Sequence, residues 1–364
     1  MTHAPMLDNI LGQPDSLRGL LAYHGSDGRK ALEAIGHTVR QCAGRIVISG
    51  MGASFFAGRP AAQRLESLGH RVLFAEASEL LHFGEGSWGE GDVALLISRS
   101  GGSIETLELA RKLTGGGVPF IAVTNIAESP LTLNARHTLD IHSHADQLIA
   151  VQTYTGTLLA LLLVAELAGG GGEVSVADQM LAALPTLEQH IHRCVEKSLG
   201  WKDLLLGEGS LYLLGRGGAL ATLDEGALLL HETAKAGAIA MSSGQFRHGP
   251  VEVVSQEFRA VVVGTPAGTR ALDWQLAQDL RAMGARIGWV GPEMTTDASG
   301  VVSLVPWPTS IAPELSPIFD IVPLQAAAYQ AALWRDIRPG DFRYASEITD
   351  QETGFPLFQA SARG

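Results

Sequence analysis

Short runs of hydrophobic, often β-branched residues recur along the chain, and most of them end at a glycine or serine turn. These runs are apolar at successive positions, which predicts strands of a parallel sheet that is covered on both faces. Between the runs, apolar residues recur at intervals of three and four, as they do on one face of a helix. The runs cover residues 45–52, 93–97, 119–123, 138–141, 211–218, 260–263, 287–290 and 301–305, and the clearest helical stretches cover 61–67, 105–112 and 273–283.

The series of strands occurs twice. Runs in the second half of the chain lie 164 to 168 positions after their counterparts in the first half, which predicts a duplicated unit. Strands and helices that alternate at this spacing form right-handed βαβ units. The predicted fold class is therefore α/β, with two tandem, doubly wound, flavodoxin-like parallel-sheet domains.

Glycine-rich and polar stretches indicate the domain boundaries. Four glycines at 169–172 break any helix, and a helical connector is expected at 176–200. A long helix is expected at 317–335. We therefore assign the following segments: an N-terminal segment at 1–27, a first domain at 28–170, a second domain at 176–337 and a C-terminal tail at 338–364.

The turn after the strand at 93–97 carries the clearest candidate for ligand binding. Ser98, Ser100 and Ser103 place three hydroxyls around a glycine turn that opens a helix. Backbone N–H groups and a helix N-terminus can bind phosphate there without a lysine, and the sequence lacks the GK[ST] ending of a Walker A loop. The alternative is a helix start that is merely capped by serine. The equivalent turn of the second half, residues 265–269, lacks the serine cluster. This difference favours an interpretation in which the first copy carries the ligand loop and the second copy is scaffold.

A second glycine turn, at 50–54, ends the first strand. Ser54 could add a hydroxyl to the same crevice, because open α/β sheets bind ligands at the carboxyl ends of their strands. A dinucleotide site is a weak competitor, since Phe55 stands where the third glycine of GxGxxG is required, and no acidic residue ends the next strand near Leu73.

Two further residues suit acid–base chemistry. Glu232 ends an apolar helical stretch, and a carboxylate near apolar surface has a raised pKa and can carry protons near neutral pH. His248 lies in a glycine-flanked loop before Pro250, where a histidine can titrate and protonate a ring oxygen. The alternative is an exposed glutamate and a histidine that caps a helix.

Composition and charge narrow the class of protein. With 43 glycines, 18% charged residues and a net charge of −12 in 364 residues, the chain suits a globular α/β enzyme and not a nucleic-acid partner. Cys42 and Cys194 lie outside any CxxC or Cys/His cluster, so we expect neither a disulfide framework nor a zinc site. The first residues do not resemble a signal peptide, and the apolar run at 158–168 is too short to span a membrane. We therefore expect a cytoplasmic protein without membrane partners.

Several motifs together resemble the double sugar isomerase (SIS) domain family. They are the S-x-S-G-x-[ST] turn at 98–103, the EGAxxxxE stretch at 225–232, the G-x-[LF]-[KR]-HGP stretch at 244–250, the M-x-x-E-I-x-x-Q-P-like opening at 6–14 and the I-P-L-Q-x-x-x-Y-like helix at 322–329. The chain is most similar in motif to the isomerase half of glucosamine–fructose-6-phosphate aminotransferase. Its relatives include aminosugar-6-phosphate deaminases and fructosamine-6-phosphate deglycases.

The resemblance implies roles for individual residues. Ser98, Arg99, Ser100 and Ser103 match the family's phosphate loop, and Ser54 lies beside it in the predicted crevice. Glu232 matches the acid that moves a proton between C1 and C2 of the sugar. His248 matches the ring-opening histidine, which in relatives reaches the neighbouring subunit, so the resemblance implies a homodimer. The ligand would be a 6-phosphorylated ketose or amino sugar, and no metal or organic cofactor is implied.

Three departures from the family refine the expected function. No glutaminase domain precedes the first sugar domain in this sequence, so we do not expect synthesis from glutamine. Residues 150–152 read A-V-Q where relatives often carry S-T-K, and Glu347 stands where the tail of relatives carries a lysine. We interpret Glu347 as a contact for a positively charged substrate group. The leading expectation is a glucosamine-6-phosphate deaminase/isomerase; the alternatives are a fructosamine-6-phosphate deglycase and a non-catalytic phosphosugar sensor.

Overall fold

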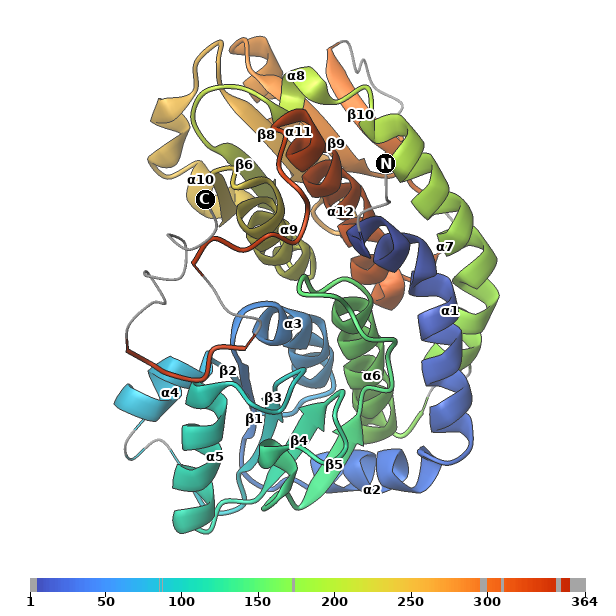
Figure 1. The fold of residues 1–364 in the computed structure, drawn as a ribbon, viewed down its shortest axis with the longest axis vertical. Helices are drawn as coiled ribbons and strands as arrows, with labels where there is room; N and C mark the ends of the chain where they lie inside the picture. The colour runs from blue at the N-terminus through green and yellow to red at the C-terminus, as the bar shows by residue number, and fades with distance from the viewer. Residues whose placement is uncertain are drawn as a thin grey trace, which may run out of the picture. The chain divides into compact units, whose positions relative to one another are not determined.

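The computed structural model groups the chain into two compact units, each built on its own sheet (Figure 1). The β1–β5 unit comprises Asp15–Leu181 and Asp341–Gly364, and the β6–β10 unit comprises Met1–Pro14 and Ala182–Gly340. The helices α1 (Pro5–Gly25) and α7 (Val176–Ser198) carry the chain from one unit to the other. The structure describes residues 5–84, 86, 88–171, 174–294, 300–308, 311–344 and 348–353.

The β1–β5 unit holds five parallel strands in the order β2-β1-β3-β4-β5. Helices α4 and α5 cover one face, where they pack on alternate residues of the strands, and α2, α3 and α6 pack together in a second layer. The strands are β1 (Ile46–Gly50), β2 (Val72–Phe74), β3 (Val93–Ile97), β4 (Phe120–Thr124) and β5 (His137–Asp140). The helices are α2 (Arg29–Arg40), α3 (Gly52–Ser67), α4 (Ala77–Phe83), α5 (Ile104–Gly115), the 3₁₀ turn η1 (Pro130–Thr132) and α6 (Gln152–Gly169).

The β6–β10 unit repeats this topology with the order β10-β9-β8-β6-β7, again parallel throughout. Helices α9 and α12 pack together, as α3 and α6 do in the first unit, and α11 packs on β8 and β9. The strands are β6 (Leu211–Gly215), β7 (Ala238–Ser242), β8 (Arg259–Val263), β9 (Arg286–Gly291) and β10 (Val301–Pro306). The helices are α8 (Lys202–Leu205), α9 (Ala219–Ala234), α10 (Ser243–Phe246), η2 (Pro250–Val253), α11 (Arg270–Ala282), η3 (Pro313–Leu315) and α12 (Ser316–Trp334).

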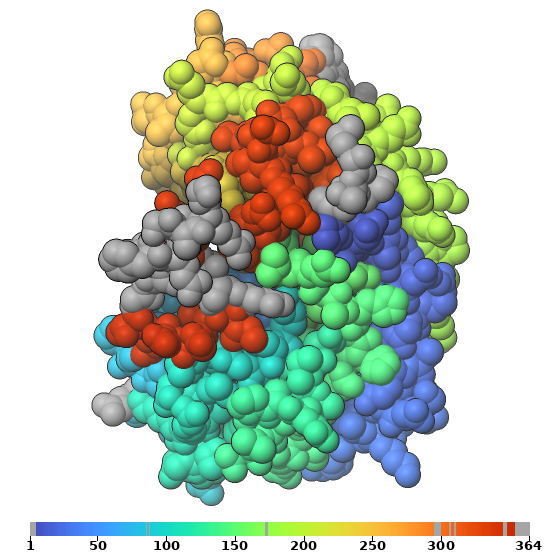
Figure 2. Space-filling view, viewed as in Figure 1, coloured from blue at the N-terminus to red at the C-terminus, as the bar shows by residue number. Residues whose placement is uncertain are grey.

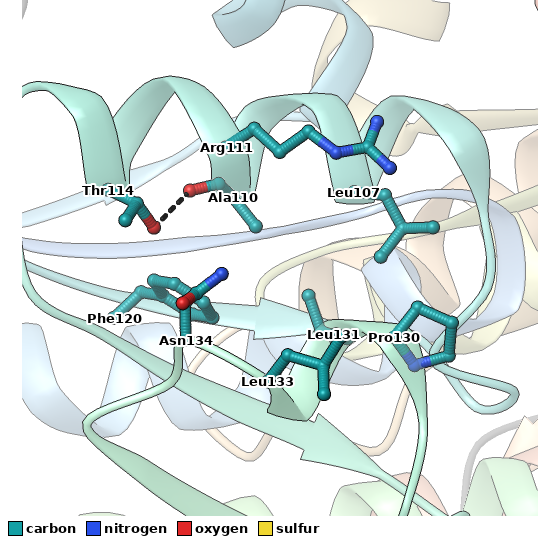
Figure 3. Close-up of a pocket in the computed structure, with 9 residues that line it drawn as sticks. All are labelled: Leu107, Ala110, Arg111, Thr114, Phe120, Pro130, Leu131, Leu133 and Asn134. Carbon is teal, nitrogen blue, oxygen red and sulfur yellow. Dashed lines mark hydrogen bonds between the residues drawn. The ribbon is translucent and has the colours of Figure 1, made fainter.

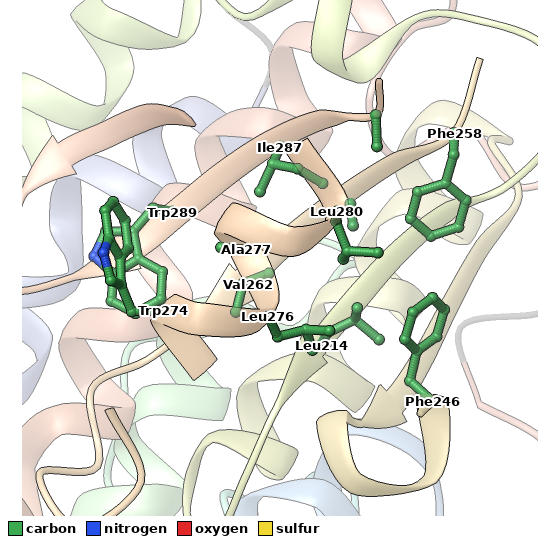
Figure 4. Close-up of a cluster of buried hydrophobic side chains, with 12 residues drawn as sticks. Leu214, Phe246, Phe258, Val262, Trp274, Leu276, Ala277, Leu280, Ile287 and Trp289 are labelled. Carbon is green, nitrogen blue, oxygen red and sulfur yellow. The ribbon is translucent and has the colours of Figure 1, made fainter. Parts of the chain in front are cut away.

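Aromatic side chains fill the core between α11 and the second sheet. Trp274 of α11 meets Trp289 of β9 edge to face, with ring centroids 4.9 Å apart (Figure 4). Phe246 and Phe258 pack against each other at the far end of the same cluster. Aromatic pairs in this geometry add to the free energy of burying their surface, so the cluster holds α11 firmly on the sheet.

The predicted fold class is confirmed by the two parallel sheets and their shared strand order. Every predicted apolar run corresponds to an observed strand, because parallel strands covered on both faces are apolar at successive positions. The runs did not include β2 and β7, which each lie at the edge of a sheet and are mostly half-buried, so their sequences carry a weaker signal. Within the described ranges, no helix is both long and apolar enough to cross a membrane.

His190 makes the stability of the β6–β10 unit depend on pH. The ring is buried in α7, donates through Nε2 to the carbonyl of Phe319 at 3.2 Å, and has its pKa lowered to about 4 by burial. The unfolded chain therefore binds more protons than the native state below pH 6.5, so this group's contribution to stability is complete at neutral pH and is lost as the pH falls toward 4.

The parent protein should lose more unfolding free energy between pH 7.5 and pH 5 than the variant His190→Gln does. We predict a difference of about 2 kcal/mol, because pH 5 lies about 1.5 units below the pKa of histidine in the unfolded chain. Glutamine can still donate to the Phe319 carbonyl, and urea denaturation at the two pH values measures the difference. The control is His192→Gln, because His192 is exposed on the same helix. Equal pH slopes in His190→Gln and the parent protein would contradict the prediction.

Candidate active site

The candidate site lies where the chain reverses direction across the first sheet. From β1 the chain passes through α3 to β2 on one side, and from β3 it passes through α5 to β4 on the other. The carboxyl ends of β1 and β3, at Gly50 and Ile97, therefore flank a topological switch point (Figure 1). Ligands of open α/β sheets bind in the crevice at this position.

Gly101 allows the loop after β3 to turn tightly. Its φ is +63°, a left-handed conformation that favours glycine, and a Cβ there would lie 2.1 Å from the hydroxyl of Ser129. Its N–H donates to the carbonyl of Ser98 at 2.9 Å, and its carbonyl accepts from the N–H of Leu131 at 3.1 Å. The loop backbone is thus fixed by contacts with the segment that follows β4.

The serine side chains converge on this turn. Ser98 and Ser103 share a hydrogen bond of 3.1 Å between their hydroxyls, and the hydroxyl of Ser100 accepts from the N–H of Gly102 at 3.2 Å. The hydroxyl of Ser54, on the first turn of α3, accepts from the N–H of Arg99 at 3.3 Å. The structure therefore brings all five candidates of the phosphate loop together at the switch point.

A merely capping role does not account for Ser103. Ser103 is the N-cap residue of α5, yet its side chain makes no capping hydrogen bond and turns to Ser98 instead. The N-terminus of a twelve-residue helix points into the same loop, and its partial positive charge favours an anion there. Neutral donors together with a helix dipole form an arrangement that can bind a phosphate group.

The described part of the C-terminal tail lies over the start of α5. The carbonyl of Thr349 accepts from the N–H of Ile104 at 3.0 Å, and Glu352 lies 3.0 Å from the ring of His82 on α4. In Figure 2 this stretch of tail, in red, lies against the cyan and teal residues of α4 and α5. Glu347, the predicted tail contact, lies outside the described residues.

Glu232 and His248 both belong to the β6–β10 unit. Glu232 is half-buried in the last turn of α9, and its carbonyl accepts from the ammonium of Lys235. His248 is exposed after α10, where its N–H donates to the carbonyl of Gln245 at 3.0 Å. Gly249, with a φ of +121°, then turns the chain into η2. The predicted glycine-flanked loop with proline at the start of a helical turn is therefore present.

The equivalent switch point of the second sheet is occupied by the chain's own side chains. Arg216, which follows β6, pairs with the buried carboxylate of Asp273 in α11. Asp320 of α12 accepts from the hydroxyl of Thr265 at 2.6 Å and from the indole N–H of Trp307 at 2.8 Å. Burial raises the pKa of Asp320 to about 7. These groups bond to one another, which agrees with the interpretation of this copy as scaffold.

Three positioning residues were not found by reading the sequence. The carbonyl of Arg99 accepts from the N–H of Asn125 at 2.9 Å and from the hydroxyl of Thr124 at 3.1 Å. Asp146 accepts from the N–H groups of Val151, Gln152 and Thr153 and so caps α6. Thr124 and Asn125 end the strand beside β3, and that placement was the signal that could have identified them.

A pocket of about 100 Å³ lies elsewhere in the β1–β5 unit, between α5, the start of β4 and η1 (Figure 3). Its lining includes Leu107, Arg111 and Leu133 but none of the candidate site residues. Over the described ranges, no three His, Cys, Asp or Glu residues are grouped so that they could hold a metal ion.

Comparison with known proteins gives a family match and full-length structural likeness. Residues 41–167 match the SIS domain. The glutamine–fructose-6-phosphate aminotransferase of Pyrobaculum aerophilum is 30% identical over 345 residues, which are 92% of this chain and 55% of the relative. The Streptococcus pneumoniae aminotransferase is 26% identical over 91% of this chain and 56% of its own length. The chain thus spans about half the length of these curated relatives.

Two solved structures share the fold over nearly the whole chain. The C-terminal domain of glucosamine-fructose-6-phosphate aminotransferase from Francisella tularensis has a TM-score of 0.80 at 21% identity, covering 92% of this chain and 97% of that one. Glucosamine-6-phosphate deaminase from Thermotoga maritima has a TM-score of 0.76 at 19% identity, covering 95% and 99%. The chain is therefore a SIS domain protein: residues 41–167 match that domain, and the paired doubly wound sheets share the fold of the two solved structures.

Proposed function

We propose that the protein is an enzyme that isomerises a 6-phosphorylated sugar between its aldose and ketose forms. The observation that carries the proposal is the serine loop at the β1/β3 switch point, where hydroxyls, a glycine turn and the N-terminus of α5 meet. This arrangement offers neutral donors to a phosphate group in the place where α/β sheets bind ligands. Membership of the SIS family and the names of the relatives support a phosphosugar as the ligand.

In this proposal, Glu232 and His248 provide the acid–base chemistry. His248 gives a proton to the ring oxygen, which opens the sugar ring. Glu232 removes the proton from C2 and returns it to C1, so that an aldose becomes a ketose or its nitrogen analogue. Acid–base groups are sufficient for both steps, so the reaction requires no metal or organic cofactor.

For an amino sugar, we propose that the same proton transfer is coupled to loss of ammonia. Moving the C2 proton of glucosamine-6-phosphate to C1 leaves an imine at C2, and one water molecule then replaces the nitrogen to give fructose-6-phosphate and ammonia. The Thermotoga maritima neighbour is named as a glucosamine-6-phosphate deaminase, which supports this choice. A deglycase would instead release an amine from a fructosamine-6-phosphate.

Incubation with glucosamine-6-phosphate tests the proposal directly. Ammonia and fructose-6-phosphate should appear in equal amounts, and the product's C1 should carry solvent deuterium by proton NMR in D₂O. Release of an amino acid from a fructosamine-6-phosphate but no ammonia from glucosamine-6-phosphate would identify a deglycase. Tight binding of phosphosugars without turnover of any would show a sensor and overturn the enzymatic proposal.

The first prediction concerns the phosphate loop. Ser100→Ala removes a hydroxyl beside the predicted phosphate, and a hydrogen bond to a charged group is worth about 1.5–3 kcal/mol. Glucosamine-6-phosphate should therefore bind at least about tenfold more weakly in calorimetry. Ser67→Ala is the matched control, because Ser67 ends α3 and donates to the carbonyl of Arg64. Equal losses for glucosamine with and without its phosphate would indicate a structural role only.

The second prediction concerns the proton carrier. Glu232→Gln keeps the size of the side chain but removes the proton acceptor, so exchange of the C1 and C2 protons with D₂O should fall by at least about a hundredfold. Phosphosugar affinity should change little. Glu196→Gln, on an exposed position of α7, serves as the control. Exchange at the parental rate in Glu232→Gln would exclude enolisation by this residue.

The third prediction concerns assembly. We propose a homodimer in which His248 of one subunit acts in the site of the other, as the family resemblance implies. Mixing the inactive variants Glu232→Gln and His248→Ala, followed by verified subunit exchange, should restore up to about a quarter of the parental activity, because one site in each mixed dimer is then intact. A mixture that exchanges subunits and stays inactive would place both residues in a site within one chain.

A further inference from the structure

The backbone of Arg99 is held on three sides at the candidate site. Its N–H donates to the hydroxyl of Ser54 at 3.3 Å, and its carbonyl accepts from the N–H of Asn125 at 2.9 Å and from the hydroxyl of Thr124 at 3.1 Å. The first contact comes from α3 and the other two come from the end of β4. The root of the Arg99 side chain is therefore fixed between the ends of β1 and β4, directly at the switch point.

Among the described residues, the guanidinium of Arg99 makes a single hydrogen bond. Nη1 donates to the carbonyl of Leu148 at 3.3 Å, and a guanidinium has five N–H donors. The side chain is half-buried. Among the residues that the structure describes, Arg99 forms no ion pair, whereas Arg45 and Arg111 of the same unit are each paired with a carboxylate.

Within the ranges that the structure describes, no carboxylate on the neighbouring elements forms an ion pair with this cation. Asp146, which follows β5, directs both carboxylate oxygens to the N-terminus of α6. Glu105 lies in the first turn of α5, Glu128 lies between β4 and η1, and His144 precedes Asp146, but none of the three is paired with Arg99 in the described ranges. In a protein with a net charge of −12, Arg99 thus adds a positive charge to the proposed phosphate loop, and the described residues place no paired carboxylate on it.

We infer that Arg99 makes the site selective for the doubly charged form of a phosphate monoester over singly charged tetrahedral anions. This inference rests on the proposed phosphate loop. Hydroxyls and N–H groups are neutral donors, so they discriminate little between a singly and a doubly charged oxyanion, and Arg99 would supply that discrimination. A guanidinium forms charge-assisted hydrogen bonds that strengthen with the charge on the acceptor. A phosphate monoester acquires its second charge with a pKa near about 6, whereas a sulfate ester carries one charge at any physiological pH.

Glucitol 6-phosphate and glucitol 6-sulfate are suitable probes. Both lack a carbonyl, so neither can be turned over, and they differ mainly in the charge of the tetrahedral group. Their dissociation constants are measured by calorimetry at pH 5 and pH 7.5, with Arg99→Gln, Arg99→Lys and the parent protein. Comparing Arg99→Gln with the parent protein at the same pH separates the contribution of Arg99 from that of the other protein groups.

The parent protein should prefer the phosphate at pH 7.5, and the preference should shrink at pH 5. In Arg99→Gln the preference at pH 7.5 should fall by about tenfold, while the affinity for the sulfate changes by less than about threefold. Arg99→Lys should retain the rise in preference with pH, because the charge remains. Arg111→Gln is the control, since Arg111 lies farther along α5 beside the pocket of Figure 3 and pairs with Glu108.

Two results would overturn the inference in different ways. If Arg99→Gln keeps the parental preference at both pH values, or loses both ligands equally, Arg99 does not select the charge, although the phosphate loop can still hold. If the parent protein binds neither probe, the proposed phosphate loop fails together with this inference. Melting curves of each variant, compared with Arg111→Gln, separate a loss of folding from a loss of selectivity.

Discussion

The close contact between Gly101 and Ser129 is the constraint on which the candidate site depends. A left-handed residue without a side chain lets the loop after β3 fold back on the segment after β4, where the carbonyl of Gly101 accepts from Leu131. The fold-back directs the hydroxyls of Ser98 and Ser103 toward each other and leaves the N-terminus of α5 facing the loop. Any larger residue at 101 would displace the backbone that carries the serines.

The duplicated fold has two equivalent switch points, and the side chains at these two positions differ. Both sheets have the same strand order, so both offer a crevice at the carboxyl ends of their first and third strands. In the β1–β5 unit the hydroxyls of Ser54, Ser98 and Ser103 and the backbone of Arg99 meet at that position. In the β6–β10 unit Arg216 pairs with Asp273, and the carboxylate of Asp320 accepts hydrogen bonds from Thr265 and Trp307. Burying such groups is tolerated because they are paired, and removing one partner would leave a charge uncompensated.

The electrostatics of the site are local. A net charge of −12 repels anions at long range, so a phosphate site in this protein must rely on short-range donors. Serine hydroxyls, backbone N–H groups and a helix dipole act over a few ångströms and are little affected by the overall charge. Arg99 adds the one full charge within the loop Ser98–Ser103, and hydrogen bonds fix its backbone.

The sequence by itself determined the two sheets and the loop. Strands buried on both faces must be apolar at successive positions, so the runs at 93–97 and 260–263 were readable without any tertiary knowledge. Since parallel strands end at one edge of the sheet, the proximity of Ser54 to the serine loop also followed from the pattern alone. The proposed roles of Glu232 and His248 rest on family resemblance, because no local pattern distinguishes a proton carrier from a surface glutamate.

Tertiary structure alone decided which remote groups hold these elements in place. The N–H of Ile104 donates to the carbonyl of Thr349 in the tail, and the hydroxyl of Thr124 donates to the carbonyl of Arg99. Both hydrogen bonds join positions far apart in the chain. Backbone carbonyls and N–H groups are the same in every residue, so the sequence carries no mark of which ones will pair across such distances. Their partners are set only when the helices and strands pack, because packing fixes which unsatisfied backbone groups lie within hydrogen-bonding distance.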